Sequence, residues 1–258
     1  MFKTILFDVQ EGVATLTLNR PDTLNALTFE LMREVGQALD QVQSQPSIRA
    51  LVLTGAGRGF CSGQDLRDRA PADADIETLL MSAYYPPLAA LRTCRVPVIA
   101  AVNGVAAGAG CSLAMACDVI LAARSAKFIQ IFSRIGLVPD LGATYLLPRA
   151  IGRARALRAM MTHEPIPAQT AADWGLISEC VDDQALPQAA HRLAVQLAQG
   201  PTQALVQTRA LLDAASQNDF EAQFRLELRV QQQIRQTHDA KEGVAAFVEK
   251  RTAKFEGR

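Results

Sequence analysis

A chain of 258 residues, 49% hydrophobic and 20% charged, is long enough to bury a large core, which excludes low-complexity disorder, collagen and a disulfide miniprotein. Basic and acidic side chains both number 26, so the formal net charge is zero and a nucleic acid is not an expected partner. Five cysteines without C-x-x-C spacing and three histidines without an i, i+4 pair predict neither a disulfide framework nor a metal site. This cysteine usage fits the reducing cytoplasm, and the amino terminus lacks the pattern of a signal peptide.

The first fifth of the chain predicts a β-hairpin, a helix and a buried strand. Residues 2–9 and 13–18 are rich in strand-forming side chains and are joined by a Glu-Gly pair typical of a turn. Apolar residues then recur at helical spacing over residues 31–42, with Thr28 as the expected N-cap. Residues 49–53 predict a buried strand that runs into a glycine-rich loop.

Residues 96–117 form a stretch without charge that is long enough in principle to span a bilayer. We interpret it as buried in the protein core, because it is rich in Ala and Gly and an Asn-Gly pair divides it. The division leaves a strand over residues 98–102 and a helix that begins near Ala109, and residues 119–122 predict a further strand. Strands that alternate with helices predict an α/β fold, and a membrane is not an expected partner.

Beyond Val181 the apolar residues keep helical spacing almost to the end of the chain. We therefore expect an α/β core over residues 1–181 and a helical region over residues 182–258. The pattern leaves open whether this helical region packs on its own core or on a neighbouring subunit.

Two common catalytic patterns are not matched by the chain. The loop of residues 55–59 resembles a dinucleotide fingerprint at first, but Phe60 follows where a third glycine is needed for close packing of helix on strand. No segment matches the G-x-S-x-G pattern of a nucleophilic serine. Neither a nicotinamide dehydrogenase nor a serine hydrolase is therefore expected.

A run of small residues, 104–111, lies between a predicted strand and a predicted helix. Small side chains allow a ligand to approach the backbone, and the first N–H groups of a helix have no partner within that helix. The run predicts either a backbone site for a ligand oxygen or tight packing of helix on sheet, and its composition fits both.

Asp140 stands among apolar residues between Pro139 and Gly142. On position alone, such an aspartate is expected to be a turn or N-cap residue. Burial beside a ligand would instead raise its pKa and make it a competent proton shuttle.

Five short motifs occur in order along nearly the whole chain. They are LNRP at residues 18–21, GFCSGQDL at 59–66, AVNG and GAGC within 101–111, GLVP at 136–139 and FVEKR at 247–251. Together they resemble the motifs of the crotonase family, which is also called the enoyl-CoA hydratase/isomerase family.

The resemblance implies a spiral of ββα turns followed by a C-terminal helical trimerisation region, with trimers often paired into hexamers. It implies an acyl-CoA thioester as substrate and no separate cofactor, since coenzyme A arrives as part of the substrate. The two backbone N–H groups that hold the thioester oxygen in the family match Gln64 and Ala109. The further implied substrate contacts are Ser62, Asp65, Leu66, Phe132 and, from an adjacent subunit, Phe247 and Lys250.

The chain departs from the family's hydratases at the two glutamates that activate water. The matching positions are Ser112 and Phe132, neither of which can act as a general base, while Asp140 stands where hydratases have glycine. This arrangement resembles the family's isomerases of phenylacetate breakdown, in particular the 1,2-epoxyphenylacetyl-CoA isomerases, and implies that Asp140 transfers protons. A dehalogenase-like member places a nucleophilic aspartate at the same point, so the position alone does not fix the reaction.

We therefore expect an acyl-CoA isomerase that works through a thioester enolate, without a metal or redox cofactor. The alternatives are an enoyl-CoA hydratase and a crotonase-like binding module without chemistry. The preferred acyl group and the choice between trimer and hexamer stay open.

Overall fold

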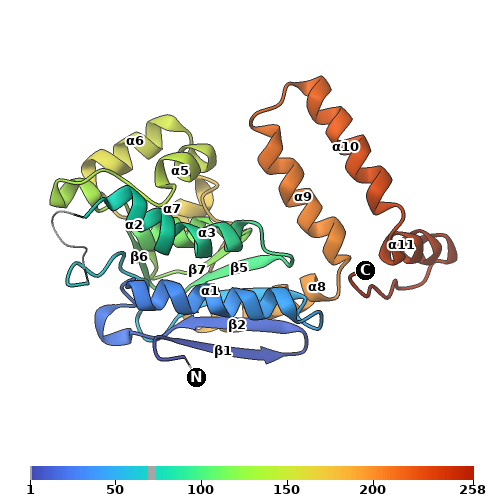
Figure 1. Ribbon diagram of the computed structural model, residues 1–258, viewed down its shortest axis with the longest axis horizontal. Coiled ribbons are helices and arrows are strands. Elements are labelled where there is room, and N and C mark those ends of the chain that lie inside the picture. Colours follow the sequence, from blue (N-terminus) through green and yellow to red (C-terminus); the bar gives the residue numbers. More distant parts are fainter. Residues whose placement is uncertain (1, 69–73) are drawn as a thin grey trace.

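The computed structural model describes residues 2–68 and 74–258 (Figure 1). It opens with an antiparallel hairpin of β1 (Ile5–Gln10) and β2 (Val13–Leu18), which confirms the first prediction. Helix α1 (Phe29–Ser44) follows, and the Thr28 hydroxyl accepts a hydrogen bond from the Leu31 N–H at 3.1 Å. Thr28 is thus the predicted N-cap, because its side chain satisfies a donor that the helix leaves free.

The middle of the chain repeats one pattern of two strands followed by helical segments. The first turn has β3 (Ala50–Gly55), β4 (Gly59–Cys61), α2 (Ile76–Ala83) and α3 (Tyr85–Arg92). The second has β5 (Val98–Val102), β6 (Val105–Ala107) and α4 (Ala109–Met115). The third has β7 (Val119–Ala123), β8 (Lys127–Ile129), η2 (Phe132–Ile135), α5 (Ala143–Ile151) and α6 (Arg153–Thr162).

Each turn places its first strand in one sheet and its second strand in another. The larger sheet has the order β1-β2-β3-β5-β7-β10, and the smaller has the order β4-β6-β8-β9. All pairs from β2 onward are parallel except β8 with β9. The remaining short elements are β9 (Ile166–Pro167), α7 (Ala168–Asp173) and β10 (Glu179–Val181). The expected spiral of ββα turns is therefore present.

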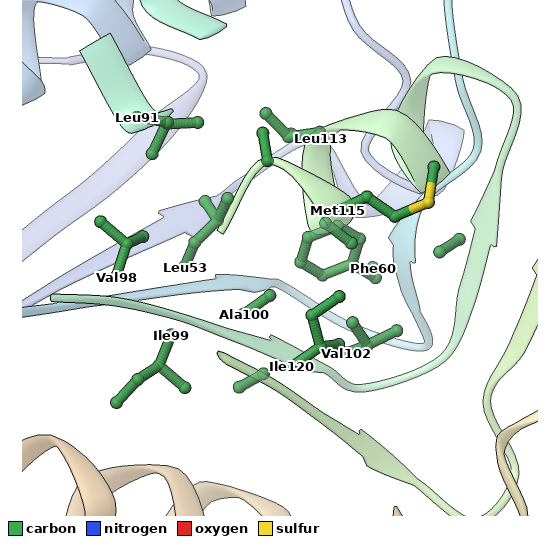
Figure 2. Packing of buried hydrophobic residues seen from close by; sticks show 14 of the residues in the cluster. Leu53, Phe60, Leu91, Val98, Ile99, Ala100, Val102, Leu113, Met115 and Ile120 are labelled. Atoms are coloured by element: carbon green, nitrogen blue, oxygen red, sulfur yellow. The ribbon is translucent and has the colours of Figure 1, made fainter. Parts of the chain in front are cut away.

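The uncharged stretch 96–117 lies in the centre of the molecule as β5, β6 and α4, as expected for a core segment. Figure 2 shows apolar side chains of β3, β5, β7 and α4 gathered around Phe60, which is fully buried. Burial of one such side chain contributes about 1.5–3 kcal/mol to folding. The core thus fixes the ends of β4 and β6 and the start of α4, which carry the candidate site.

The chain after β10 is helical, as predicted. It comprises η3 (Asp183–Ala185), α8 (Leu186–Ala198), α9 (Thr202–Ala215), α10 (Phe220–Ile234) and α11 (His238–Glu249). Helix α8 packs on β3 and β5, whereas α9 and α10 extend away from the sheets as a pair, with α11 near the base of that pair (Figure 1). The division at Val181 stays a prediction. Within the described ranges, every helix is too short or too polar to cross a membrane.

Candidate active site

Two backbone segments approach each other where β4 and β6 end. Gly63 and Gly108 have φ values of +97° and +50°, a region that favours glycine. A Cβ atom on Gly63 would lie 2.9 Å from the Ala107 carbonyl oxygen and 3.5 Å from the Ala109 nitrogen. A Cβ on Gly110 would lie only 2.3 Å from the Cys61 carbonyl oxygen. The run of small residues therefore does serve close packing, at Gly110 above all.

The same approach brings two free N–H groups together. Ala109 is the first residue of α4, so its N–H has no partner within the helix. The Leu27 N–H donates to the Gly63 carbonyl at 2.7 Å, and the Asp65 N–H donates to the Leu27 carbonyl at 2.8 Å. Successive N–H groups on an extended segment point to opposite sides. The intervening Gln64 N–H faces away from Leu27, and within residues 2–68 and 74–258 no acceptor pairs with it or with the Ala109 N–H. Two adjacent unpaired donors can stabilise one oxygen on which negative charge develops.

The loop that carries Gln64 is fastened by the side chains of its neighbours. The Asp65 carboxylate is buried and forms an ion pair with Arg20 at 2.9 Å, and this partner lowers the pKa of Asp65. The Ser62 hydroxyl donates to the Thr23 carbonyl at 3.0 Å. Both side chains hold the loop in place, and their predicted contact with substrate stays a prediction, as does that of the exposed Leu66.

Asp140 lies in the loop between η2 and α5. Its carbonyl accepts hydrogen bonds from the Ala143 N–H at 3.0 Å and from the Ser112 hydroxyl at 3.3 Å, so its backbone forms the expected turn. The N-cap interpretation is wrong, because Gly142 is the residue that precedes α5 and no side chain caps this helix. The Asp140 Oδ1 atom is buried and has no hydrogen-bond partner in the described residues.

Desolvation raises the pKa of the Asp140 carboxyl above its ordinary value. The next residue, Leu141, has a φ of +46°, which is strained for a side chain of this size. A half-buried carboxyl with a raised pKa, next to a strained residue, is suited to accept and return a proton.

Ser112 joins the backbone of Asp140 to α4, and Phe132 lies beside Gly108, the residue before α4. Ser112 is fully buried on α4, and its hydroxyl is bound to the Asp140 carbonyl. Phe132 is also buried, and a Cβ atom on Gly108 would meet its ring at 3.7 Å. The start of α4, η2 and Asp140 therefore surround one small region. Neither Ser112 nor Phe132 supplies a base there.

An apolar crevice of about 620 Å³ lies between α2, α3 and the start of α5. Its walls include Leu80, Met81, Leu88, Leu141, Tyr145 and Leu146. The crevice reaches Leu141 and Gly142, the two residues directly after Asp140. No local sequence pattern reveals this crevice, because its walls come from helices far apart in the chain.

Phe247 and Lys250 are separate from this region within one chain. They lie on and directly after α11, at the opposite end of the molecule from α5 and α6 (Figure 1). Phe247 is 86% exposed, and Lys250 is exposed as well. Their approach to the substrate of an adjacent subunit stays a prediction.

All five cysteines are free, so none of them forms a disulfide. Among the residues that the structure describes, no group of three or more His, Cys, Asp or Glu side chains is placed to hold a metal ion.

Comparisons with known proteins extend over the whole chain. The family model described as "Enoyl-CoA hydratase/isomerase" matches residues 8–258. A Rhodobacter capsulatus protein named "Probable enoyl-CoA hydratase" is 46% identical and covers 100% of this chain and 99% of its own. The 1,2-epoxyphenylacetyl-CoA isomerase of Escherichia coli is 44% identical, with full coverage of both chains.

A solved enoyl-CoA hydratase from Polaromonas superposes with a TM-score of 0.91 at 35% identity, over 97% of this chain and 99% of that one. The resemblance and the fold class that the sequence motifs predicted are thereby confirmed. The chain belongs to the enoyl-CoA hydratase/isomerase family.

Proposed function

We propose that the protein is an acyl-CoA isomerase that moves a proton, or rearranges an epoxide, next to a thioester enolate. The observation that carries the proposal is the Oδ1 atom of Asp140, which is buried without a hydrogen-bond partner among the described residues. The backbone carbonyl of Asp140 is bound by Ser112 on α4, the helix whose first N–H is free. Asp140 is the proton carrier, and the N–H groups of Gln64 and Ala109 hold the thioester oxygen.

The reaction with a 3-enoyl-CoA proceeds in two steps. Asp140 takes a proton from the α-carbon, and the electron pair of that C–H bond moves toward the thioester oxygen to form a dienolate. The two N–H donors stabilise this charge because they are fixed in place before it develops. Asp140 then returns the proton to the γ-carbon, and the pair returns as the 2,3 double bond. The desolvation that raises its pKa helps the carboxyl to act in both steps.

The names of the relatives support two reactions. The Escherichia coli relative is named as a 1,2-epoxyphenylacetyl-CoA isomerase, and the Rhodobacter capsulatus relative as a hydratase. Ser112 and Phe132 favour the isomerase, since hydration requires a group that activates water and these two side chains supply none. Hydration stays the second candidate. A binding module without chemistry would gain nothing from a carboxyl oxygen that is buried without a partner, which is costly.

A comparison of three thioesters tests the proposal. The protein is incubated separately with a 3-enoyl-CoA, crotonyl-CoA and 1,2-epoxyphenylacetyl-CoA, and absorbance and product mass are followed. We expect isomerisation to exceed hydration of crotonyl-CoA by at least about a hundredfold. Ser112 and Phe132 supply no second base to activate water, and a general base contributes about 10²–10⁴-fold to the rate. Faster hydration than isomerisation would contradict the isomerase assignment, and inertness toward all three would favour the binding module.

We also propose that chains assemble into a homotrimer or a pair of trimers through the helical C-terminal region. The support is the apolar surface of the extended helices, where Leu212 is 71% and Phe220 is 86% exposed. In such an assembly Phe247 and Lys250 of one chain would complete the coenzyme A site of the next, with the ammonium group beside a phosphate. The free cysteines agree with the reducing cytoplasm as the compartment.

A further inference from the structure

Two cavities meet at Arg92, the last residue of α3. Arg92, Ala116 and Leu146 line the apolar crevice between α2, α3 and α5, and the same three residues line a second cavity of about 370 Å³. The second cavity lies between the end of α4 and α9, and its apolar walls include Met115, Leu197, Leu205 and Val206. The three shared residues therefore form a partition between two cavities.

The crevice begins beside Asp140 and reaches Arg92 at the end of α4. Leu141 lines its near end, and the Asp140 carbonyl is bound to Ser112 on α4. Ala116 follows Ser112 by four residues, and its N–H donates to the Ser112 carbonyl at 3.0 Å. It therefore lies on the same face of α4, about 6 Å further along the axis. An acyl group that starts beside Asp140 and follows the crevice meets Arg92 at the far end.

Arg92 is the one charged residue of the partition, and its guanidinium has partners on both sides. It donates to the Asp213 carboxylate on α9 at 3.1 Å, and it lies 5.7 Å from the centre of the Tyr145 ring. Tyr145 lines the crevice, whereas Asp213 lines the second cavity. Burial of a charged group against an apolar chain is costly. A methylene chain can therefore pack on Ala116 and Leu146 but not readily on the guanidinium.

We propose that the ion pair of Arg92 with Asp213 closes the far end of the crevice and limits the length of the acyl group that the enzyme binds. The inference rests on the proposed function, which places the acyl group beside Asp140. An acyl group that ends before Arg92 buries all its methylene groups in the crevice. A longer one must displace the guanidinium or leave its end in water. The substrate class is then a short or medium-length acyl-CoA, although an apolar cavity lies directly beyond the ion pair.

A series of saturated thioesters that the enzyme cannot isomerise tests this limit by binding alone. Straight-chain acyl-CoAs from butanoyl-CoA to dodecanoyl-CoA are titrated into the full-length protein, and calorimetry gives each Kd. In the wild type, Kd should fall by about fourfold for each added methylene group, the effect of burying it, until the chain reaches Arg92 and the fall stops. Arg92→Ala removes the guanidinium, so the fall should continue into the second cavity. Two methylene groups beyond the wild-type limit, this variant should bind at least about tenfold more tightly than the wild type.

Arg149→Ala is the matched control. The Arg149 guanidinium also lies over the Tyr145 ring, at 3.5 Å, but Arg149 lines neither cavity. This variant should keep the wild-type limit. Arg92→Met keeps a long side chain without the charge, and it should extend the series as Arg92→Ala does, because a flexible apolar side chain yields to a methylene chain. It also provides the result if Arg92→Ala does not fold.

Three results would each overturn the inference. They are a wild-type series without a limit, the same limit in the wild type and in the folded Arg92 variants, and an equal extension in Arg149→Ala. Turnover of the wild type separates the inference from the proposed function. If the protein isomerises a 3-enoyl-CoA but the Arg92 variants keep the limit, the role of Arg92 fails and the isomerase assignment stands. If the limit moves but nothing is isomerised, the proposed function fails and the length limit stands.

Discussion

Asp140→Asn is expected to lower kcat for isomerisation of a 3-enoyl-CoA by about 10²–10⁴-fold, the range for loss of a general acid–base group. Asparagine keeps the shape of the side chain but cannot accept the α-proton. The backbone contacts of Asp140 to Ala143 and Ser112 do not involve the carboxyl, so the loop should keep its conformation. Steady-state kinetics measure the loss of kcat, and the Kd of a saturated acyl-CoA shows whether the loop keeps its conformation.

The dependence on pH provides the control. Because the pKa of Asp140 is raised by desolvation, the wild-type kcat/KM should fall as pH drops through that raised pKa, since the protonated carboxyl is no base. A pKa raised by folding also means that this carboxyl favours the folded state only at pH below its unfolded pKa, and that this contribution is lost as pH rises. Asp140→Asn should therefore be more stable than the wild type at neutral pH. Wild-type turnover in this variant would show that another group carries the proton.

Ala109→Pro should lower kcat/KM by about 10²–10³-fold, the effect of removing one oxyanion donor. Proline has no N–H, and it is accepted at the first position of a helix, so α4 should still form. The side chain of Ala109 is buried and takes no part in the chemistry. Kinetics with a 3-enoyl-CoA measure the loss of kcat/KM, and circular dichroism shows whether the variant is folded.

Ala109→Gly is the matched control, because it changes the side chain and keeps the N–H. Its turnover should stay within a few-fold of the wild type. A folded Ala109→Pro protein with near-normal turnover would show that this backbone position serves packing only. The close contact of Gly110 with Cys61 would then be the whole purpose of the small-residue run.

The long elements of the fold could be predicted from the sequence because their signals are local. Thr28 caps α1 through its own side chain, and the Glu-Gly pair turns the first hairpin within two residues. The strands β4, β6 and β8 were missed. Each has three residues, too few to show an alternating pattern, and they form only because the larger sheet positions them side by side.

The roles of the candidate site residues stay predictions. The motifs pointed to Gln64, Ala109 and Asp140. In the described residues, the first two have free backbone donors, and the third has one buried carboxyl oxygen without a partner. The positive φ of Leu141 and Gly142 removes Asp140 from the N-cap position, which no pattern of residue types reveals.

The most direct test of the account is a crystal structure of the protein with a saturated acyl-CoA. We expect the thioester oxygen to lie within about 2.7–3.1 Å of both the Gln64 and Ala109 nitrogens, the geometry of an oxyanion site. The Asp140 carboxyl should face the α-carbon, and Lys250 of the partner subunit should lie beside a coenzyme A phosphate. A thioester oxygen that meets neither nitrogen, or an α-carbon remote from Asp140, would contradict it.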